Sequence, residues 1–189
     1  MTLTKQSNFR RIAEGLDVEP LLQLLDAKPE LWKEIEARQK FTGSPHKDTE
    51  TIYARGALKM THYYVIWDTG SYDYPCMEYL KPALVPLMRP ILEQLGVKDL
   101  GRVLIVNLKP CGHVKKHIDQ GTYANRYQRF HLVLRSNPYC FQTSGDELQR
   151  FEVGEAWYMN NKELHEAHNV GDTERIHIIF DCVPTVELQ

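Results

Sequence analysis

Two histidines and one aspartate have types and spacings suited to holding a metal ion. His117 and Asp119 flank Ile118, and in an extended segment the alternation of side chains puts them on one face. His165 follows Asp119 by 46 residues and so comes from a distant part of the chain. Together they would form a two-histidine, one-carboxylate face that leaves adjacent metal positions open. The alternative for the first pair is a surface histidine and aspartate near a turn.

Arg175 is a candidate for binding an anion beside that metal. It lies ten residues after His165 and begins a strand-like apolar run over residues 176–180. A guanidinium there is costly to bury unless it meets an anion, and its planar fork suits a carboxylate. The two-histidine, one-carboxylate set is typical of non-haem Fe(II) oxygenases. Arg175 could therefore anchor the distal carboxylate of 2-oxoglutarate while the keto-acid end chelates iron.

Further candidates come from the same strands. Arg129 and His131 share one face of a predicted strand over residues 129–134, so both are candidates for the same cavity. The alternative for Arg129 is a surface charge at a strand start. His177 shares the face of Arg175, and a hydrogen-bonded core position explains it as well as a pocket role. The remaining histidines are predicted to be structural, with His168 in a loop: His46, His62, His113 and His168.

The second half of the chain has the pattern of antiparallel β structure. Short apolar runs separated by turn residues follow Gly101 and leave no room for intervening helices. We predict strands over five segments: residues 102–108, 129–134, 139–142, 155–159 and 175–181. The pattern favours a sandwich or barrel over a βαβ sheet.

The first half of the chain has to support that β structure. Residues 8–39 carry apolar positions at three-to-four spacing with prolines where helices start, which predicts two or three short helices. Residues 80–95 predict one more helix. Two segments have the aromatic and β-branched bias of strands, residues 51–55 and 63–67. We expect residues 1–100 to brace a catalytic core formed by residues 101–189, in one structural domain, and to take part in substrate recognition.

Length and composition exclude several classes of protein. The 189 residues suit one domain, and the net charge of −2 gives no general reason to bind nucleic acid or an anionic membrane. The longest apolar run, residues 83–88, is too short for a spanning helix, and the first residues lack the apolar core of a secretory signal. The four cysteines form no C-x-x-C pair, so we expect reduced thiols and a cytoplasmic protein.

The order of these features resembles one known family, the aspartyl/asparaginyl β-hydroxylases, which are Fe(II)/2-oxoglutarate-dependent dioxygenases. The resemblance covers residues 102–181 and combines separately placed elements with the expected gaps. They are Pro110-Cys-Gly-His-Val-x2-His117-x-Asp119, Arg129-Phe-His131, Gly154-Glu-Ala-Trp157-x2-Asn160-x4-His165 and Arg175-Ile-His-Ile-Ile-Phe-Asp181. Some members of the family that act on protein substrates lack the carboxylate ligand, whereas this sequence has Asp119 at the matching position.

The resemblance implies a fold and a set of roles. The fold is mainly β with N-terminal helices (α+β), built on a double-stranded β-helix, the cupin-like jelly roll, with Fe(II) at its open end. The metal positions match His117, Asp119 and His165, the arginine that binds 2-oxoglutarate matches Arg175, and a further pair at the co-substrate's site matches Arg129 and His131.

The leading hypothesis is a hydroxylase that uses Fe(II), 2-oxoglutarate and O2 and forms succinate and CO2. Its substrate would be an amino acid or a peptidyl residue, in a small molecule or a polypeptide. A cupin-like metal-dependent isomerase or hydrolase is one alternative, with no special need for Arg175. A non-catalytic ligand-binding jelly-roll module is the other. The aromatic-rich residues 63–79 could line a pocket mouth, although strand packing explains most of them.

Overall fold

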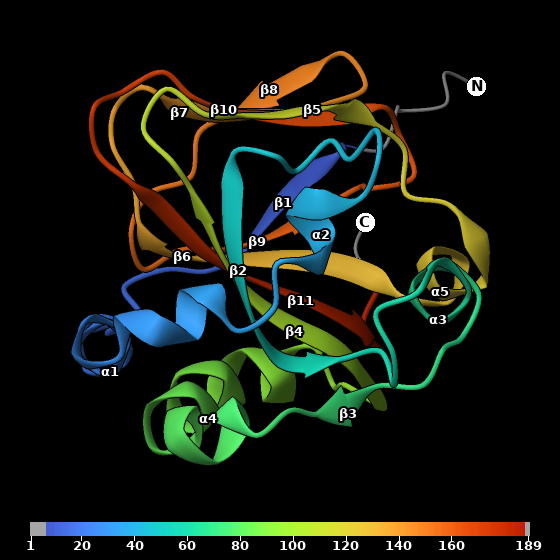
Figure 1. Ribbon diagram of the computed structural model, residues 1–189, viewed down its shortest axis with the longest axis horizontal. Coiled ribbons are helices and arrows are strands. Elements are labelled where there is room, and N and C mark those ends of the chain that lie inside the picture. Colours follow the sequence, from blue (N-terminus) through green and yellow to red (C-terminus); the bar gives the residue numbers. More distant parts are fainter. Residues whose placement is uncertain (1–6, 188–189) are drawn as a thin grey trace.

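Two antiparallel sheets packed face to face form the centre of the molecule (Figure 1). The computed structural model describes residues 7–187. Within them, the large sheet has the strand order β1 (Phe9–Ala13), β9 (Ala156–Met159), β6 (Gln128–Arg135), β11 (Arg175–Val183), β4 (Asp99–Leu108), β2 (Thr49–Gly56) and β3 (Tyr72–Asp73). The small sheet has the order β5 (His113–His117), β10 (His165–Asn169), β7 (Cys140–Ser144) and β8 (Glu147–Gln149). The predicted antiparallel sandwich is confirmed.

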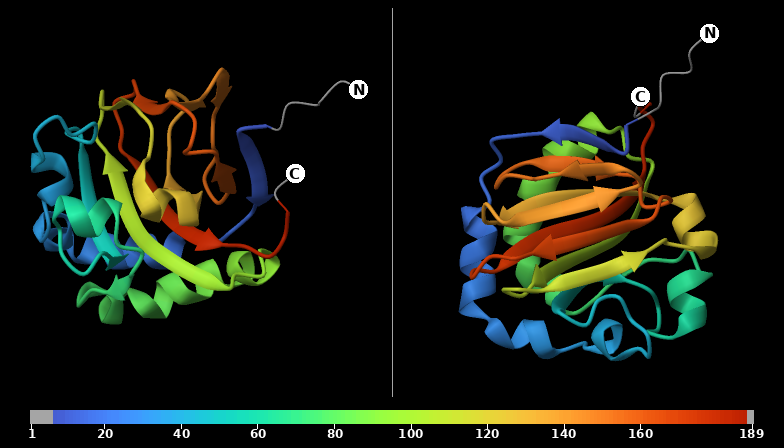
Figure 2. Two further views of the ribbon diagram at one scale, coloured as in Figure 1. Left: turned by 90° about the vertical axis from the view of Figure 1, so that its right-hand side faces the viewer. Right: turned by 90° about the horizontal axis from the view of Figure 1, so that it is seen from above.

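Two helices cover the outer face of the large sheet. They are α1 (Glu19–Ala27) and α4 (Cys76–Gln94). Figure 2 shows these layers from two further sides, with α4 beneath the large sheet in the left-hand view. The other helical segments are short: the 3-10 helix η1 (Pro29–Lys33), α2 (Ala37–Lys40), α3 (His62–Ile66) and α5 (Gly121–Arg126). No helix of the described residues is long and apolar enough to cross a membrane.

Alternation along β6 and β11 separates an apolar layer from a polar one. Phe130 and Phe180 stack with ring centroids 5.2 Å apart, and with their even-numbered neighbours they pack into the main core that α1 and α4 complete. The odd-numbered positions point the opposite way, toward the small sheet, because successive side chains of a strand alternate between faces. They carry Arg129, His131, Arg175, His177 and Asp181. The strand period thus places ionisable groups between the sheets.

Helix α4 confirms the helix expected over residues 80–95 and begins earlier, at Cys76. Its prolines Pro82, Pro86 and Pro90 lie four residues apart and are all exposed. They therefore share the solvent side of the helix, while the apolar side contributes residues such as Leu84 to the core.

Four local predictions are wrong. The second half is predicted to leave no room for helices between its strands, yet α5 lies between β5 and β6. Residues 9–13 form an edge strand rather than a helix, because β1 pairs with β9 from the far end of the chain. Residues 63–67 lie largely in helix α3 instead of a strand. His168 belongs to β10 rather than to a loop, since β10 pairs with both β5 and β7. In each case contacts distant in sequence override the local pattern.

The first hundred residues also enter the large sheet directly. β2 pairs with β4 along most of its length, and β1 closes the other edge beside β9. The loop after α2 is tied to the small sheet, where the Lys115 backbone N–H donates to the Pro45 carbonyl at 2.9 Å. Residues from the first half therefore reach the space beside the predicted metal ligands.

Candidate active site

The structure brings the three predicted metal ligands together where β5 and β10 meet. His117 ends β5 and His165 begins β10, and the two residues are direct partners in the antiparallel register. Asp119 follows β5, and its backbone N–H donates to the Asn161 carbonyl. One ligand atom from each of the three residues lies within 4.8 Å of the others. The register between β5 and β10 and the turn after β5 together bring the three residues close to one another.

Both imidazoles are oriented to present Nε2. The Nδ1–H group of His117 donates to the Lys115 carbonyl at 2.7 Å, and that of His165 donates to the Glu163 carbonyl at 2.9 Å. The carbonyls can only accept, so each Nε2 carries the lone pair. His117 Nε2 is buried and has no hydrogen-bond partner among the described residues. Two oriented imidazoles and a carboxylate fit a divalent transition metal ion.

Asp119 is held as a charged ligand. Its Oδ2 accepts hydrogen bonds from Arg129 Nη1 and from Asn161 Nδ2, the latter at 2.9 Å. Burial alone would raise the pKa of Asp119, but Arg129 and the neighbouring His165 hold it well below its usual range. Arg129 also donates to Asp181 at 2.9 Å. The side chain of Asp119 is thereby fixed with Oδ1 3.6 Å from His117 Nε2.

The two candidate ligand histidines are neutral at physiological pH. Burial, with the neighbouring His165, lowers the pKa of His117 to about 4. Burial likewise lowers the pKa of His165. Neutral imidazole is the form that binds a metal, so no proton has to leave either ring before an ion enters at pH 7.

Arg175 lies next to this centre as a buried cation without an anion. It is 2% exposed, and its Nη2 donates to Gln142 Oε1 at 2.6 Å. Among residues 7–187 no carboxylate forms an ion pair with it, and burial lowers the pKa of Arg175 to about 10. The neighbouring Gln142 Nε2, His131 Nε2 and His177 Nε2 are buried and have no partner within the described chain. Of the two neutral rings, the one that accepts in the Nδ1–Nδ1 contact carries its proton on Nε2, so an anionic ligand with several acceptor oxygens would satisfy that Nε2–H, the Gln142 amide and the Arg175 guanidinium.

One narrow cavity between the sheets joins Arg175 to the metal centre. Its lining includes His117, His165, Arg129, His131 and Arg175. Apart from Asp119, the residues expected to bind metal and co-substrate therefore face a common space. These side chains fit Fe(II) and 2-oxoglutarate, because both histidines of the candidate metal triad and the Arg175 guanidinium line the same cavity.

A larger cavity of about 610 Å³ adjoins the narrow one, with which it shares Arg38, His46, His117 and Arg129, and it also includes Asp119 in its lining. Arg129 and Asp181 form part of its wall. The rest of the lining comes mainly from the first half of the chain, including Arg38, the loop over residues 41–46, Tyr53, Met60 and residues 65–67. This cavity has room for a substrate next to the candidate metal centre.

Comparison with known proteins agrees with this geometry. Residues 28–184 match the family model described as Aspartyl/Asparaginyl beta-hydroxylase. The chain belongs to this family. The match covers more than the second half of the chain and includes every candidate metal and co-substrate residue.

One curated relative of this chain is the L-proline cis-4-hydroxylase of Rhizobium meliloti (strain 1021). The two are 29% identical over 84 residues, which is 44% of this chain and 29% of the relative. The chain thus aligns with less than a third of the relative's length.

Solved structures with low sequence identity share the fold. A prolyl 4-hydroxylase from Pseudomonas putida superposes with a TM-score of 0.52 at 14% identity, covering 95% of this chain and 94% of that one. A viral collagen prolyl hydroxylase from Paramecium bursaria Chlorella virus-1 gives 0.51 at 11% identity, covering 96% and 97%. A 2OG-Fe(II) oxygenase family protein from Burkholderia pseudomallei gives 0.52 at 12%, covering 71% and 65%. The predicted jelly-roll core of a mainly β protein is confirmed.

The sequence did not point to several residues that shape the site of this β-hydroxylase family member. Asn161 and Gln142 orient Asp119 and Arg175, yet isolated amides carry no sequence signal for such roles. His46, predicted to be structural, lies edge-on to His117 with ring centroids 5.0 Å apart. Of the aromatic residues over 63–79, Trp67 lines the large cavity, whereas the Tyr74 hydroxyl donates to the Ala57 carbonyl.

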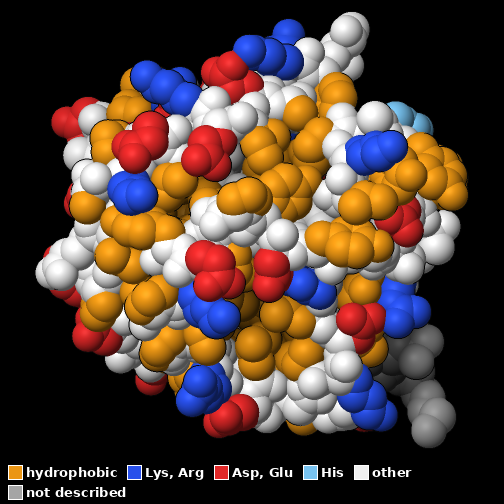
Figure 3. All heavy atoms as spheres, turned by 60° about the horizontal axis from the view of Figure 1, so that its bottom comes forward, with side chains coloured by type: hydrophobic (Ala, Val, Ile, Leu, Met, Phe, Trp, Pro, Cys, Tyr) orange, Lys and Arg blue, Asp and Glu red, His pale blue; other side chains and the backbone are white. Residues whose placement is uncertain are grey.

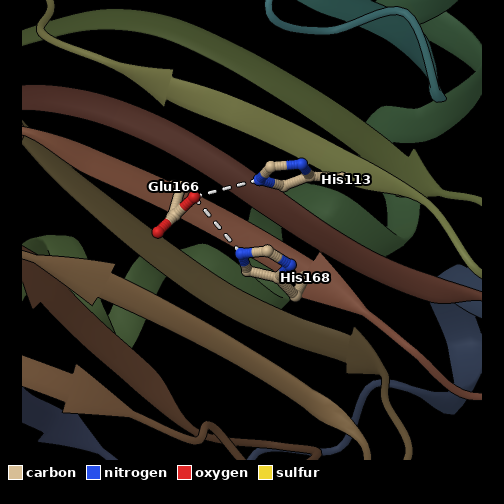
Figure 4. A group of neighbouring side chains, drawn as sticks. All are labelled: His113, Glu166 and His168. Atoms are coloured by element: carbon tan, nitrogen blue, oxygen red, sulfur yellow. Dashed lines mark hydrogen bonds and ion pairs between the residues drawn. The ribbon is translucent and has the colours of Figure 1, made fainter.

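A second His/Glu/His group lies on the outer face of the small sheet (Figure 4). Glu166 accepts from His113 Nε2 at 3.0 Å and from His168 Nε2 at 3.3 Å. Glu166 and His168 alternate with the inward-facing His165 on β10, so they point away from the candidate active site. These ring nitrogens are already hydrogen-bonded, whereas His117 Nε2 is not, which makes the inner triad the better metal centre.

Another cavity, of about 580 Å³, lies between α4 and β4. In Figure 3 the bottom of Figure 1 is turned toward the viewer, and this face shows hydrophobic side chains mixed with charged ones. The lining of this cavity contains residues such as Leu84, Met88 and Val103 and none of the candidate site residues. It lies on the helix-covered side of the large sheet, away from the chemistry.

Proposed function

We propose that this protein is an Fe(II)- and 2-oxoglutarate-dependent dioxygenase that hydroxylates a C–H bond of an amino acid or a peptidyl residue, with succinate and CO2 as co-products. The observation that carries the proposal is the cluster of His117, Asp119 and His165, two of which, His117 and His165, line one cavity with the buried Arg175 that has no anionic partner in the described residues. A metal-dependent isomerase or hydrolase needs the triad but has no use for Arg175.

The residues divide the work between holding, orienting and excluding water. His117, His165 and Asp119 would hold Fe(II), and Arg129 keeps Asp119 charged and in place. Arg175 would pair with the distal carboxylate of 2-oxoglutarate. This charged hydrogen bond is stronger in a buried site than in water, because the protein interior has a lower dielectric constant. Iron and 2-oxoglutarate supply the oxidising chemistry when bound. The two sheets enclose the inner part of the site around Arg175 and His131 and keep bulk water from it.

Anaerobic reconstitution tests the proposal. Protein given Fe(II) and 2-oxoglutarate should develop a weak visible charge-transfer band, and admission of air should produce succinate. His117→Ala should abolish both, because it removes one of the ligands. His168→Ala is the matched control, since it removes a histidine of the outer group and should leave the band and the succinate yield unchanged. No band and no succinate from the unaltered protein would disprove the function, and zinc-dependent turnover under nitrogen would favour the isomerase or hydrolase.

A further inference from the structure

The large cavity contains a cation whose hydrogen-bonding capacity is only partly used. Arg38, on α2, donates from Nη2 to His46 Nε2 at 3.0 Å. Its Nη1 is buried and has no partner among the described residues, and no carboxylate of residues 7–187 forms an ion pair with it. An unpaired buried guanidinium is costly, and an anion supplied from outside would remove that cost.

The surroundings hold Arg38 in place without neutralising it. The Ser44 hydroxyl donates to the Arg38 carbonyl, and the Ser44 backbone N–H donates to the Phe41 carbonyl at 2.9 Å. These bonds fold the loop after α2 back onto the helix. His46, at the end of this loop, accepts from the guanidinium and so fixes its orientation. The free Nη1 is therefore a positioned donor rather than a mobile surface group.

Tyr53 adds a second unused donor on the same cavity. It lies on β2, is 6% exposed, and its ring packs among Leu104, Val106 and Ile179. Its buried hydroxyl has no hydrogen-bond partner in the described chain. The Arg38 charge favours ionisation of this hydroxyl, although burial is the larger effect and raises the pKa of Tyr53. Buried hydroxyls and guanidinium groups in native proteins are normally satisfied, so two unsatisfied ones on one cavity point to a ligand.

The other cations of this cavity are already engaged. Both Nη atoms of Arg102 donate to backbone carbonyls, those of Val65 and Tyr64 at 2.7 and 2.8 Å, although its buried Nε has no partner among the described residues. Arg129 is paired with Asp119 and Asp181. Arg38 differs because its Nη1 makes no hydrogen bond within residues 7–187 and its Nη2 meets a neutral imidazole. It is thus the group in this lining best placed to receive an additional negative charge.

Arg38, one of the two unused donors with Tyr53, is also close to the candidate metal centre. His46 contacts Arg38 through its Nε2 and lies edge-on to the metal ligand His117 at 5.0 Å. One imidazole therefore separates the guanidinium from the triad. A small acid bound at Arg38 would have its carbon atoms within reach of the iron site, and the apolar walls include Phe41, Met60 and Trp67.

We propose that Arg38 and Tyr53 bind the substrate's carboxylate, so that the substrate is a small free carboxylic acid, such as a free amino acid, rather than an internal residue of a polypeptide. This inference rests on the proposed function and names its substrate class. One guanidinium N–H group and one hydroxyl match the two oxygens of a carboxylate. An internal peptidyl residue presents a neutral amide there and would leave Arg38 buried without an anion.

Binding measurements on the assembled protein test this assignment. The full chain is loaded with Mn(II) and the unreactive co-substrate analogue N-oxalylglycine, and calorimetry follows the addition of L-proline, L-aspartate and the other proteinogenic L-amino acids. Each acid is compared with its C-terminal amide and with a peptide that carries the residue between blocked ends. We expect at least one free acid to bind and its amide to bind about tenfold or more weakly.

Two variants and two controls locate the effect. Arg38→Gln should weaken binding of that acid by about tenfold to a hundredfold, and Tyr53→Phe by a smaller factor, because a charged donor contributes more than a neutral one. Thr51→Val removes another buried, unpartnered hydroxyl of β2 that does not line the cavity, and Arg89→Gln removes an exposed arginine of α4. Both controls should leave the affinity unchanged.

Equal binding of acid and amide, tighter binding of the blocked peptide, no binding of any free acid, or unchanged affinity in Arg38→Gln would overturn the assignment. None of these results would affect the charge-transfer band that Fe(II) and 2-oxoglutarate produce. Failure of the proposed function removes that band in the unaltered protein, so the two failures are distinguishable. Tyr53→Phe keeps the assignment testable if Arg38→Gln does not fold.

Discussion

His117 and His165 each donate the Nδ1 proton to the carbonyl of the residue two positions earlier, Lys115 and Glu163. The same short-range bond on two different strands turns both Nε2 atoms toward Asp119. Asn161 and Arg129 orient the carboxylate from the opposite side. Partners of this kind fix the ligand tautomer and ring angle, and their loss typically costs tenfold to a hundredfold in metal affinity. The centre is therefore pre-organised for a metal ion.

Arg175→Ala separates co-substrate binding from metal binding. We expect the dissociation constant of 2-oxoglutarate to rise by about tenfold to a hundredfold, because a charge-assisted hydrogen bond is lost. Metal uptake should stay nearly intact, and the free protein should not lose stability, since the variant removes a buried charge that has no anionic partner. Titrations of metal and 2-oxoglutarate with a melting curve check this. Arg135→Ala, at a partly exposed ion pair, is the control. Loss of metal together with 2-oxoglutarate would mean that Arg175 is structural.

Helix α3 shows how a single side chain can decide the structure of an element. Arg102, on β4, donates to the carbonyls of Tyr64, Val65 and Asp68 at the end of this helix, and its guanidinium lies 3.6 Å above the Tyr123 ring of α5. Carbonyls at a helix C-terminus otherwise lack partners. Arg102 supplies those partners and joins α3 to α5 at the wall of the large cavity.

Arg102→Ala should destabilise this wall. We expect a loss of about 2 kcal/mol in the free energy of unfolding, because three partly buried carbonyls lose their donor and a stacked contact disappears. Trp67 lies at the C-terminal end of α3, so its fluorescence should report the local change. Denaturant unfolding followed by fluorescence provides the measurement. Arg126→Ala removes an exposed arginine of α5 and should cost much less. A similar loss in both variants would contradict the capping role.

Across the whole molecule, the space between the two sheets combines burial with ionisable groups. His131 and His177 are 3% and 1% exposed, and their Nδ1 atoms lie 3.4 Å apart. Burial, and then the charge of Arg175, lowers the pKa of both histidines well below the usual value. Both rings are therefore neutral in the folded protein at pH 7. Protonating them requires a charge to enter the interior beside an existing cation.

This arrangement predicts acid-sensitive stability. The unfolded chain takes up protons at these histidines below pH ~6.5, whereas the folded chain does not until a much lower pH. The unfolding free energy of the metal-free protein should thus fall as pH decreases from ~6.5, by up to about 1.4 kcal/mol per pH unit for each histidine. Denaturant unfolding at several pH values measures the slope. His177→Phe should reduce the slope, and an unchanged slope would exclude His177 as a source.

The candidate ligands and five strands of the second half could be predicted from the sequence alone, whereas β5, β8 and β10 could not. Alternation is a local property, so the residues over 129–134 and 175–181 already show which side chains share a face. Fixed spacing around His117 and His165 indicated the family. These features depend on neighbours within a few residues, and the structure keeps them.

Only the tertiary structure decided which distant groups complete the site. Phe9 enters a strand because β9 offers an edge, and residues 62–66 turn into a helix whose end Arg102 caps. Arg38 and Tyr53 meet one cavity because β2 joins the large sheet and the loop after α2 folds back toward β5. No local periodicity encodes an unpaired donor: whether a buried group lacks a partner depends on every segment packed around it, and that is known only once the chain is folded.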